Sequence, residues 1–353
     1  MSLRWDLFCR VIDNYGDIGV SWRLARDLAS RGHWVRLFVD DASALTWMAP
    51  EAIPVGIVVQ PWDTAATAGD VGDVVVETFG CDLPEPFVTR MAQRQPAPRW
   101  INLEYLSAEP YVERSHGLAS PQFSGPGRGL DKRFFYPGFT PRTGGLLREP
   151  GLPAEREAFD AGAWLAAHGI APRPDERLVS LFSYVNPGLP QLLSCLAEAG
   201  PTLLLACPGA AQRELPSLPL PAGLRWQPLP YLSQPDYDRL LWACDLNLVR
   251  GEDSFVRAQW AAKPLLWQLY PQHDGAHGPK LEAFLDLWLA GVVPPLATGL
   301  RRLWRAWNGL TDWQGTSLPP LELQQEQASQ WCRQLQAQPD LVTQLLGFVT
   351  DSR

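Results

Sequence analysis

Hydrophobic and polar positions in the first half of the chain alternate between a strand period and a helix period. The apolar run Trp5–Ile12 predicts a strand. Val20, Leu24 and Leu28 then recur at the spacing of one helix face. Further strands are predicted at Trp34–Val39, Ile57–Val59, Val74–Glu77 and Trp100–Glu104, whereas the glycine, proline and charged residues of Gly125–Gly145 predict a long surface loop. Strand–helix–strand repetition predicts a parallel, doubly wound α/β sheet.

The second half of the chain repeats this pattern. Apolar runs at 178–185, 202–209 and 224–230 predict strands, and 246–271 predicts a strand, a tight turn, a helix and a strand. Prolines near 172–174 suggest a linker, so we predict an N-terminal domain of residues 1–173 and a C-terminal domain of residues 174–336. A final helix, 337–353, is expected to return to the first domain. Two Rossmann-like domains facing across a cleft form the GT-B fold of nucleotide-sugar transferases, which is the fold class we expect.

Composition narrows the class of protein. The chain has 353 residues, 46% of them hydrophobic, and a formal net charge of -8. This acidic balance argues against a nucleic-acid partner or an anionic membrane surface. Six scattered cysteines without a CxxC pair indicate reduced thiols, and the charged first residues do not suit a signal peptide. No apolar run approaches the roughly 18 residues of a membrane span, so we expect a cytoplasmic protein.

Acidic residues follow three predicted strands of the first half. Asp13 and Asp17 come after the first strand, Glu77 and Asp82 after a later one, and Glu104 and Glu109 after another. Ligands of doubly wound sheets bind beyond the carboxyl ends of the strands. The acids therefore predict a site for a cationic acceptor rather than for a phosphate. Each acid alone could equally be a helix cap or a solvated turn.

The stretch RGEDSFVRAQW opens a helix directly after a strand of the second half. The backbone amides of Asp253 and Ser254 would lie at the helix N-terminus, where an anion is favoured, and Arg250 could add a charge-assisted contact to a diphosphate. Glu252 is unusual beside phosphates unless its side chain reaches the sugar. The alternative is that Asp253 caps the helix and Glu252 is an ordinary first-turn acid.

Aromatic residues of the second half are candidates for binding a nucleotide base. Tyr231, Gln234 and Tyr237 place two rings and an amide after a predicted strand, and Tyr184 ends another. Stacking together with amide hydrogen bonds suits a pyrimidine. Packing of these rings in the core is the alternative.

Four motifs carry a resemblance to a known family: VIDNYGDIGVSWRLARDL, ETFGCDLPE, NLEYLSAE and CDLNLVRGEDSFVRAQWAAKPLLWQLYPQHD. In order and spacing they resemble the signatures of the elongation factor P arginine rhamnosyltransferases, from about Cys9 to the last helix. The resemblance implies a bacterial cytosolic enzyme that transfers rhamnose from dTDP-β-L-rhamnose to one arginine side chain of elongation factor P, with inversion at the anomeric carbon.

The resemblance also implies roles for individual residues. Asp13, Asp17 and Glu252 match the family's essential acids, and its donor-binding positions match Tyr184, Tyr231, Gln234, Tyr237, Arg250, Asp253 and Ser254. The family more often has phenylalanine where this chain has Tyr231 and Tyr237, a change that keeps the stacking face. A GT-B site holds the leaving diphosphate with helix amides and arginine, so we expect no metal and no cofactor besides the sugar donor.

Two other functions are compatible with these motifs. A GT-B transferase for another nucleotide sugar, such as a lipopolysaccharide transferase, would normally need a basic or amphipathic face, which this acidic chain does not clearly show. A non-catalytic module that binds elongation factor P would keep the fold without turnover. Release of free dTDP separates an enzyme from such a module.

Overall fold

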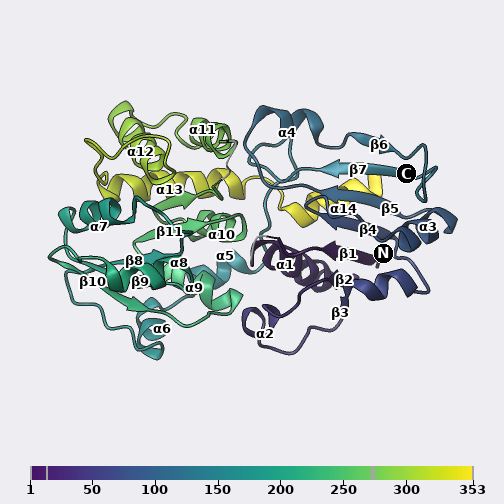
Figure 1. Cartoon of the computed structure of the whole chain (residues 1–353), viewed down its shortest axis with the longest axis horizontal. Coiled ribbons are helices and arrows are strands. Elements are labelled where there is room, and N and C mark those ends of the chain that lie inside the picture. Colours follow the sequence, from purple (N-terminus) through teal and green to yellow (C-terminus); the bar gives the residue numbers. More distant parts are fainter. Residues whose placement is uncertain (1, 13–14, 272–274, 352–353) are drawn as a thin grey trace. The chain divides into compact units, whose positions relative to one another are not determined.

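The computed structural model describes residues 2–12, 15–271 and 275–351. The chain divides into two compact units, one formed by Met1–Glu149 with Gln338–Arg353 and the other by Pro150–Ala337. Each unit contains its own sheet (Figure 1).

The first unit is built on a seven-stranded sheet in the order β3-β2-β1-β4-β5-β7-β6. All neighbours are parallel except β6 and β7. Its strands are β1 (Arg4–Cys9), β2 (Trp34–Val39), β3 (Ile57–Pro61), β4 (Val74–Thr78), β5 (Arg99–Leu103), β6 (Ala119–Pro121) and β7 (Asp131–Phe135). Its helices are α1 (Gly16–Ser30), α2 (Leu45–Met48), α3 (Glu85–Gln93), α4 (Pro110–Ser115) and α14 (Leu341–Asp351), with a 3-10 helix η1 (Trp62–Thr67).

Alternate residues of the first sheet pack into two separate cores. Leu7 of β1 faces a core that includes α1 and α14, whereas its neighbour Phe8 faces a core with η1 and α3. Successive side chains of a strand point to opposite faces, so helices on both faces favour apolar residues at most strand positions. The continuous apolar runs of the first half therefore reflect a sheet that is covered on both sides.

Several strands are shorter than the sequence predicted. The first strand ends at Cys9 rather than at Ile12, and the strands predicted at 178–185, 202–209 and 224–230 end at Leu181, Ala206 and Pro228. The segment predicted as a loop contains β7, which pairs with β5 and β6. The strand was missed because three of its five residues are charged and it shows no apolar pattern. Lys132 of β7 forms an ion pair with Glu77 at 2.6 Å and lies over the Trp100 ring, so its charge is neutralised inside the sheet layer.

The second unit contains a five-stranded parallel sheet in the order β10-β9-β8-β11-β12. The strands are β8 (Arg177–Leu181), β9 (Thr202–Ala206), β10 (Leu224–Pro228), β11 (Leu246–Arg250) and β12 (Leu265–Gln268). The helices are α5 (Leu152–Glu157), α6 (Ala161–Ala167), α7 (Leu189–Glu198), α8 (Ala210–Glu214), α9 (Gln234–Ala243), α10 (Asp253–Ala261), α11 (His277–Trp288), α12 (Pro294–Trp307) and α13 (Leu321–Gln336), with a 3-10 helix η2 (Leu215–Ser217).

Residues 150–173 belong to the second unit, whereas the sequence placed them at the end of the first domain. Trp164 and Ile170 pack in one core with residues of β8, β9 and α9. Arg225 of β10 donates a hydrogen bond to the Ala171 carbonyl at 2.9 Å and forms an ion pair with Glu176. The proline-rich segment is therefore attached to the second sheet and does not act as a linker between domains.

The C-terminal hydrophobic pattern forms two helices that belong to different units. Helix α13 ends at Gln336 in the second unit, and α14 packs in the core of the first. Pro339 lies between them, where a proline disfavours continuation of the helix. Leu341 donates a backbone hydrogen bond to Leu146, which fixes the start of α14 on the first unit. Among the described residues, none of the helices has both the length and the apolar character needed to cross a membrane.

Candidate active site

The carboxyl ends of β8 and β11 lie side by side in the second unit. Strand β8 is the first strand of its sheet, and the chain continues to β9 and β10 on one side before it crosses to β11 and β12 on the other. This reversal is the topological switch point, where α/β sheets bind their ligands. Tyr184 follows β8 and Arg250 ends β11, so both predicted donor-binding residues lie at this point.

Arg250 lies between two aromatic rings that follow β8. Its guanidinium carbon is 4.2 Å from the centre of the Phe182 ring and 4.5 Å from that of Tyr184. A planar guanidinium is attracted to the faces of such rings. The Arg250 Nη1 also donates a hydrogen bond to the Ser183 carbonyl at 3.5 Å. These contacts hold the cation in one orientation at the end of the strand.

Ser254 connects Arg250 to the start of α10. The Arg250 backbone amide donates to the Ser254 hydroxyl at 3.2 Å, and this hydroxyl donates to the Arg250 carbonyl. Glu252 occupies the N-cap position without a side-chain capping bond, and Asp253 is the first residue of the helix rather than its cap. The first amides of a helix lack carbonyl partners within the helix. The start of α10 therefore has the backbone arrangement of an anion site beside a fixed arginine.

The predicted base-binding residues are located around the start of α9. Gln234 is the buried first residue of this helix, which Ser233 caps by accepting from the amide of Asp236. The Tyr237 ring meets Phe182 edge-on, with ring centres 6.0 Å apart, so Tyr237 joins the group around Arg250. Burial raises the pKa of the Tyr237 hydroxyl well above its usual value. Tyr231 precedes the helix and is 51% exposed.

In the first unit, Asp17 lies in the first turn of α1 and is only 2% exposed. Its Oδ2 accepts a hydrogen bond from the backbone amide of Ile12 at 2.8 Å. The carboxylate therefore ties the loop after β1 to the helix, a contact that sequence reasoning did not anticipate. Its companion Asp13 lies outside the described residues.

The three acids predicted to bind the acceptor differ in their surroundings. Asp82 is exposed. Glu104 follows β5, accepts a hydrogen bond from the Asn102 side chain at 2.8 Å, and has a pKa raised by burial. Glu109 is the N-cap residue of α4 and accepts from the Ser107 hydroxyl at 3.0 Å, so it also has a local structural role.

The carboxyl edge of the first sheet is less acidic than the sequence suggested. Glu77, the acid that precedes Asp82, is a buried residue of β4 and is paired with Lys132. Burial still raises the pKa of Glu77, although Lys132 opposes the shift. Glu77 therefore contributes little net negative charge to a ligand at this edge.

Comparisons with known proteins point to one family over nearly the whole chain. The sequence model of the family described as Elongation-Factor P (EF-P) rhamnosyltransferase EarP matches residues 5–350. A protein-arginine rhamnosyltransferase of Pseudomonas aeruginosa is 45% identical over 98% of this chain and 99% of its own length. The chain belongs to this family.

Solved structures agree with this assignment. A structure that gives the structural basis for EarP-mediated arginine glycosylation of translation elongation factor EF-P is 35% identical, covers 100% of both chains and superposes with a TM-score of 0.67. The Arabidopsis thaliana UGT89C1 complexed with UDP is 12% identical over 99% of both chains, with a TM-score of 0.55, and shows the fold alone. The predicted fold class, a GT-B glycosyltransferase with two Rossmann-like units, is confirmed.

Three residues of this site were missed by sequence reasoning. Phe182 is the second ring on Arg250, and the buried Gln268 accepts the Tyr184 backbone amide at 2.9 Å. Tyr270 meets the Tyr184 ring edge-on at 5.3 Å between centres. In the sequence Phe182 looks like one more apolar residue of the predicted strand, so nothing marks it. Gln268, by contrast, is a polar residue at the end of a buried apolar strand, and this could have indicated a role in the site.

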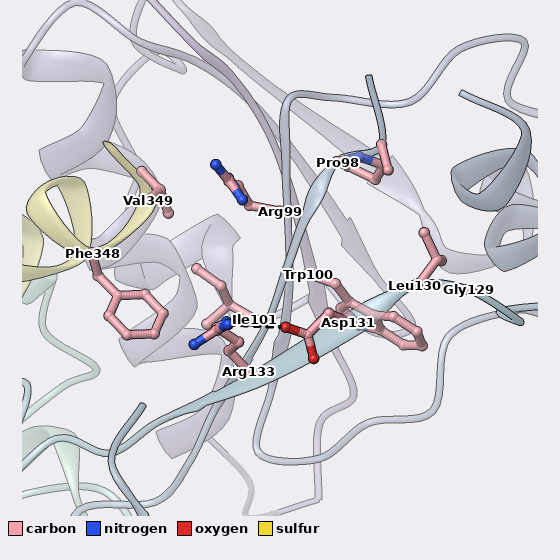
Figure 2. Close-up of a pocket in the computed structure, with 11 residues that line it drawn as sticks. Pro98, Arg99, Trp100, Ile101, Gly129, Leu130, Asp131, Arg133, Phe348 and Val349 are labelled. Carbon is pink, nitrogen blue, oxygen red and sulfur yellow. Dashed lines mark ion pairs between the residues drawn. The ribbon is translucent and has the colours of Figure 1, made fainter. Parts of the chain in front are cut away.

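A pocket of about 210 Å³ lies elsewhere in the first unit, at the amino ends of β5 and β7 (Figure 2). Arg99, Ile101 and Arg133 line it together with Phe348 and Val349 of α14. Parallel strands place their carboxyl ends at the opposite edge of the sheet. The pocket contains none of the predicted site residues and is separate from the candidate active site.

Proposed function

We propose that this chain is a protein-arginine rhamnosyltransferase that moves rhamnose from dTDP-β-L-rhamnose to a single arginine side chain of elongation factor P. The family match and the relatives named above support the reaction class. The observation that carries the proposal is the Arg250 guanidinium, which lies over the rings of Phe182 and Tyr184 beside the start of α10.

The second unit is the donor side of the proposed reaction. Arg250 and the amides of Asp253 and Ser254 bind the diphosphate and stabilise the charge that develops as it leaves. Tyr184, Tyr231, Gln234 and Tyr237 provide rings and an amide for the thymine base. Because this arrangement supplies the positive charge from the protein, the proposed reaction needs no divalent metal and no cofactor.

The first unit is the acceptor side. An arginine guanidinium is protonated and delocalised, with a pKa above about 12, so it is a poor nucleophile. Asp13 and Asp17 hold this cation, and one of them or Glu252 accepts a proton. The freed nitrogen electron pair forms a bond to the anomeric carbon while the bond to the diphosphate oxygen breaks. Attack from the face opposite the leaving group inverts the anomeric configuration and gives an α-linked product. The acids Asp82, Glu104 and Glu109 are proposed to bind the surrounding acceptor protein.

The test is incubation of the protein with dTDP-β-L-rhamnose and elongation factor P in the presence of excess EDTA. We expect release of dTDP and a mass gain of one deoxyhexose on one arginine, with an α-configured product by NMR. Binding of elongation factor P without dTDP release would indicate the non-catalytic module instead. Transfer from a different nucleotide sugar would overturn the donor assignment, and a rate that EDTA abolishes and magnesium restores would overturn metal independence.

A further inference from the structure

An aromatic pair lies at the carboxyl edge of the first sheet. Phe79 directly follows β4, and Tyr105 lies two residues beyond the end of β5. Their rings are stacked, with centres 4.3 Å apart and an angle of 15° between the planes, and Tyr105 is 39% exposed. Strands β4 and β5 are parallel neighbours, and β4 also pairs with β1, which precedes Asp17. The pair therefore lies on the edge to which the proposed function assigns the acceptor.

The backbone that carries Phe79 is held in an unfavourable conformation. Phe79 has φ +58° and Gly80 has φ +68°. A phenylalanine is rarely found in this left-handed region, and such strain persists where surrounding contacts determine it. Two hydrogen bonds to β5 do so, from the Phe79 amide to the Leu103 carbonyl at 2.7 Å and from the Gly80 amide to Asn102 Oδ1 at 3.2 Å. The fold thus keeps the Phe79 ring against Tyr105 despite the strain.

The same asparagine orients a carboxylate beside the aromatic pair. Asn102 is buried, and its Nδ2 donates to Glu104 Oε1 at 2.8 Å. Glu104 immediately precedes Tyr105, so one side chain fixes both the turn that carries Phe79 and the acid next to Tyr105. Burial, together with the negative charge of Glu104, raises the pKa of Tyr136 to about 12. An aromatic face beside a fixed carboxylate favours a cationic side chain.

We propose that Phe79, Tyr105 and Glu104 form a docking site for a basic side chain of the acceptor protein, other than the arginine that receives the sugar. This inference rests on the proposed function, which assigns the target arginine to Asp13 and Asp17. An enzyme that modifies one arginine of one protein needs contacts with residues around the target, because every arginine presents the same guanidinium. A second cation bound on the aromatic pair provides such a contact through complementary charge.

The test compares Tyr105→Ala with the matched variant Tyr105→Phe, which keeps the ring face and removes only the hydroxyl. A further control is Trp34→Ala, since Trp34 is an exposed aromatic residue at the amino end of β2. Two quantities are measured: the Kd for elongation factor P without donor, and the KM and kcat of rhamnosylation with saturating donor. We expect Tyr105→Ala to raise Kd and KM roughly 3- to 30-fold with kcat within about twofold, the range for loss of one cation–π contact. Tyr105→Phe and Trp34→Ala should stay within about twofold of the wild type.

The two readouts separate this inference from the proposed function. If the wild type binds elongation factor P and Tyr105→Ala binds it equally well, the docking site is refuted. If the wild type binds without transferring sugar, the proposed function fails, and the Kd values of the variants still decide the docking site. If the wild type neither binds nor modifies elongation factor P, both proposals fall. Unchanged affinity in Glu104→Gln would remove the carboxylate from the site.

Discussion

Two substitutions of Asp17 can distinguish a structural role of this residue from a chemical one. Its Oδ2 accepts the backbone amide of Ile12 at 2.8 Å, and the residue is almost fully buried. Asp17→Asn keeps a carbonyl oxygen that can accept this hydrogen bond, but it removes the negative charge and the ability to take a proton. Asp17→Ala removes both the bond and the charge.

The expected magnitudes differ for stability and for rate. Loss of the hydrogen bond in Asp17→Ala should lower the free energy of unfolding by about 1–2 kcal/mol. This corresponds to a fall in Tm of roughly 2–8 °C for a unit of this size. Asp17→Asn should leave Tm nearly unchanged. If Asp17 accepts the proton, both variants should lose about 10²–10⁴ in rate, which is roughly 2.7–5.4 kcal/mol of transition-state stabilisation.

The assay is single-turnover rhamnosylation of elongation factor P with both substrates saturating, together with donor calorimetry and thermal melting. Donor affinity should change by less than about fivefold, because the proposed donor residues belong to the second unit. Near-normal turnover in Asp17→Asn would refute the general-base role. If Asp17→Ala alone were slow, the role of Asp17 would be to hold the loop after β1, and Asp13 or Glu252 would become the candidate base.

Three further predictions concern the second unit. Arg250→Lys should weaken donor binding roughly 10-fold or more by calorimetry, because an ammonium cannot stack between two rings as a guanidinium does; unchanged affinity would remove Arg250 from the diphosphate site. Tyr237→Phe should change donor affinity less than about threefold and Tm by only a few degrees, because it keeps the ring against Phe182 and loses at most a contact of the buried hydroxyl with Ser254; a large loss of affinity would mean that the donor uses this hydroxyl. Arg225 lowers the pKa of Glu176 to about 2, so the contribution of this carboxylate to stability is present above its unfolded pKa near 4.5 and is lost as pH falls toward 2. Glu176→Gln should therefore lower the unfolding free energy by about 1 kcal/mol at pH 7, a small value because solvent around the exposed Arg225 screens the ion pair. The difference in unfolding free energy from the wild type should disappear between pH 4.5 and 2. A difference that persists at pH 2 would contradict this.

Much of the fold was predictable because both sheets are covered on two faces. Buried parallel strands are apolar at most positions, so Trp34–Val39 and Leu246–Arg250 stand out from their surroundings. Strand β7 escaped notice because Lys132 is tolerated there through its ion pair with Glu77, a partner that another strand supplies. The boundary near 173 failed for the same reason, since the contacts of Arg225 with Ala171 and Glu176 join residues that are distant in sequence.

The candidate site was predictable in its residue types and less so in its arrangement. An arginine followed by a helix start can be read from the sequence, but the stacking of Arg250 on Phe182 depends on β8 and β11 being neighbours. For the same reason the sequence could not distinguish the exposed Asp82 from the buried Glu77, which is neutralised by Lys132. The sequence shows how many charged residues there are, but the order of the strands in the sheet decides which of them form ion pairs.

In the proposed reaction the two units bind opposite charges at different positions of one fold. In a dinucleotide-binding Rossmann domain the phosphate lies at the turn after the first strand. In this chain the first strand of the second unit, β8, is followed instead by Phe182 and Tyr184, and the arrangement suited to an anion lies across the switch point at Arg250 and α10. In the first unit the turn after β1 leads to Asp17, whose carboxylate would repel a phosphate. Neither first turn is therefore suited to a phosphate. The aromatic rings after β8 instead hold Arg250, to which the proposed function assigns the diphosphate. In the proposed function the acids after β1 instead bind a cation, which is the charge that an arginine acceptor brings.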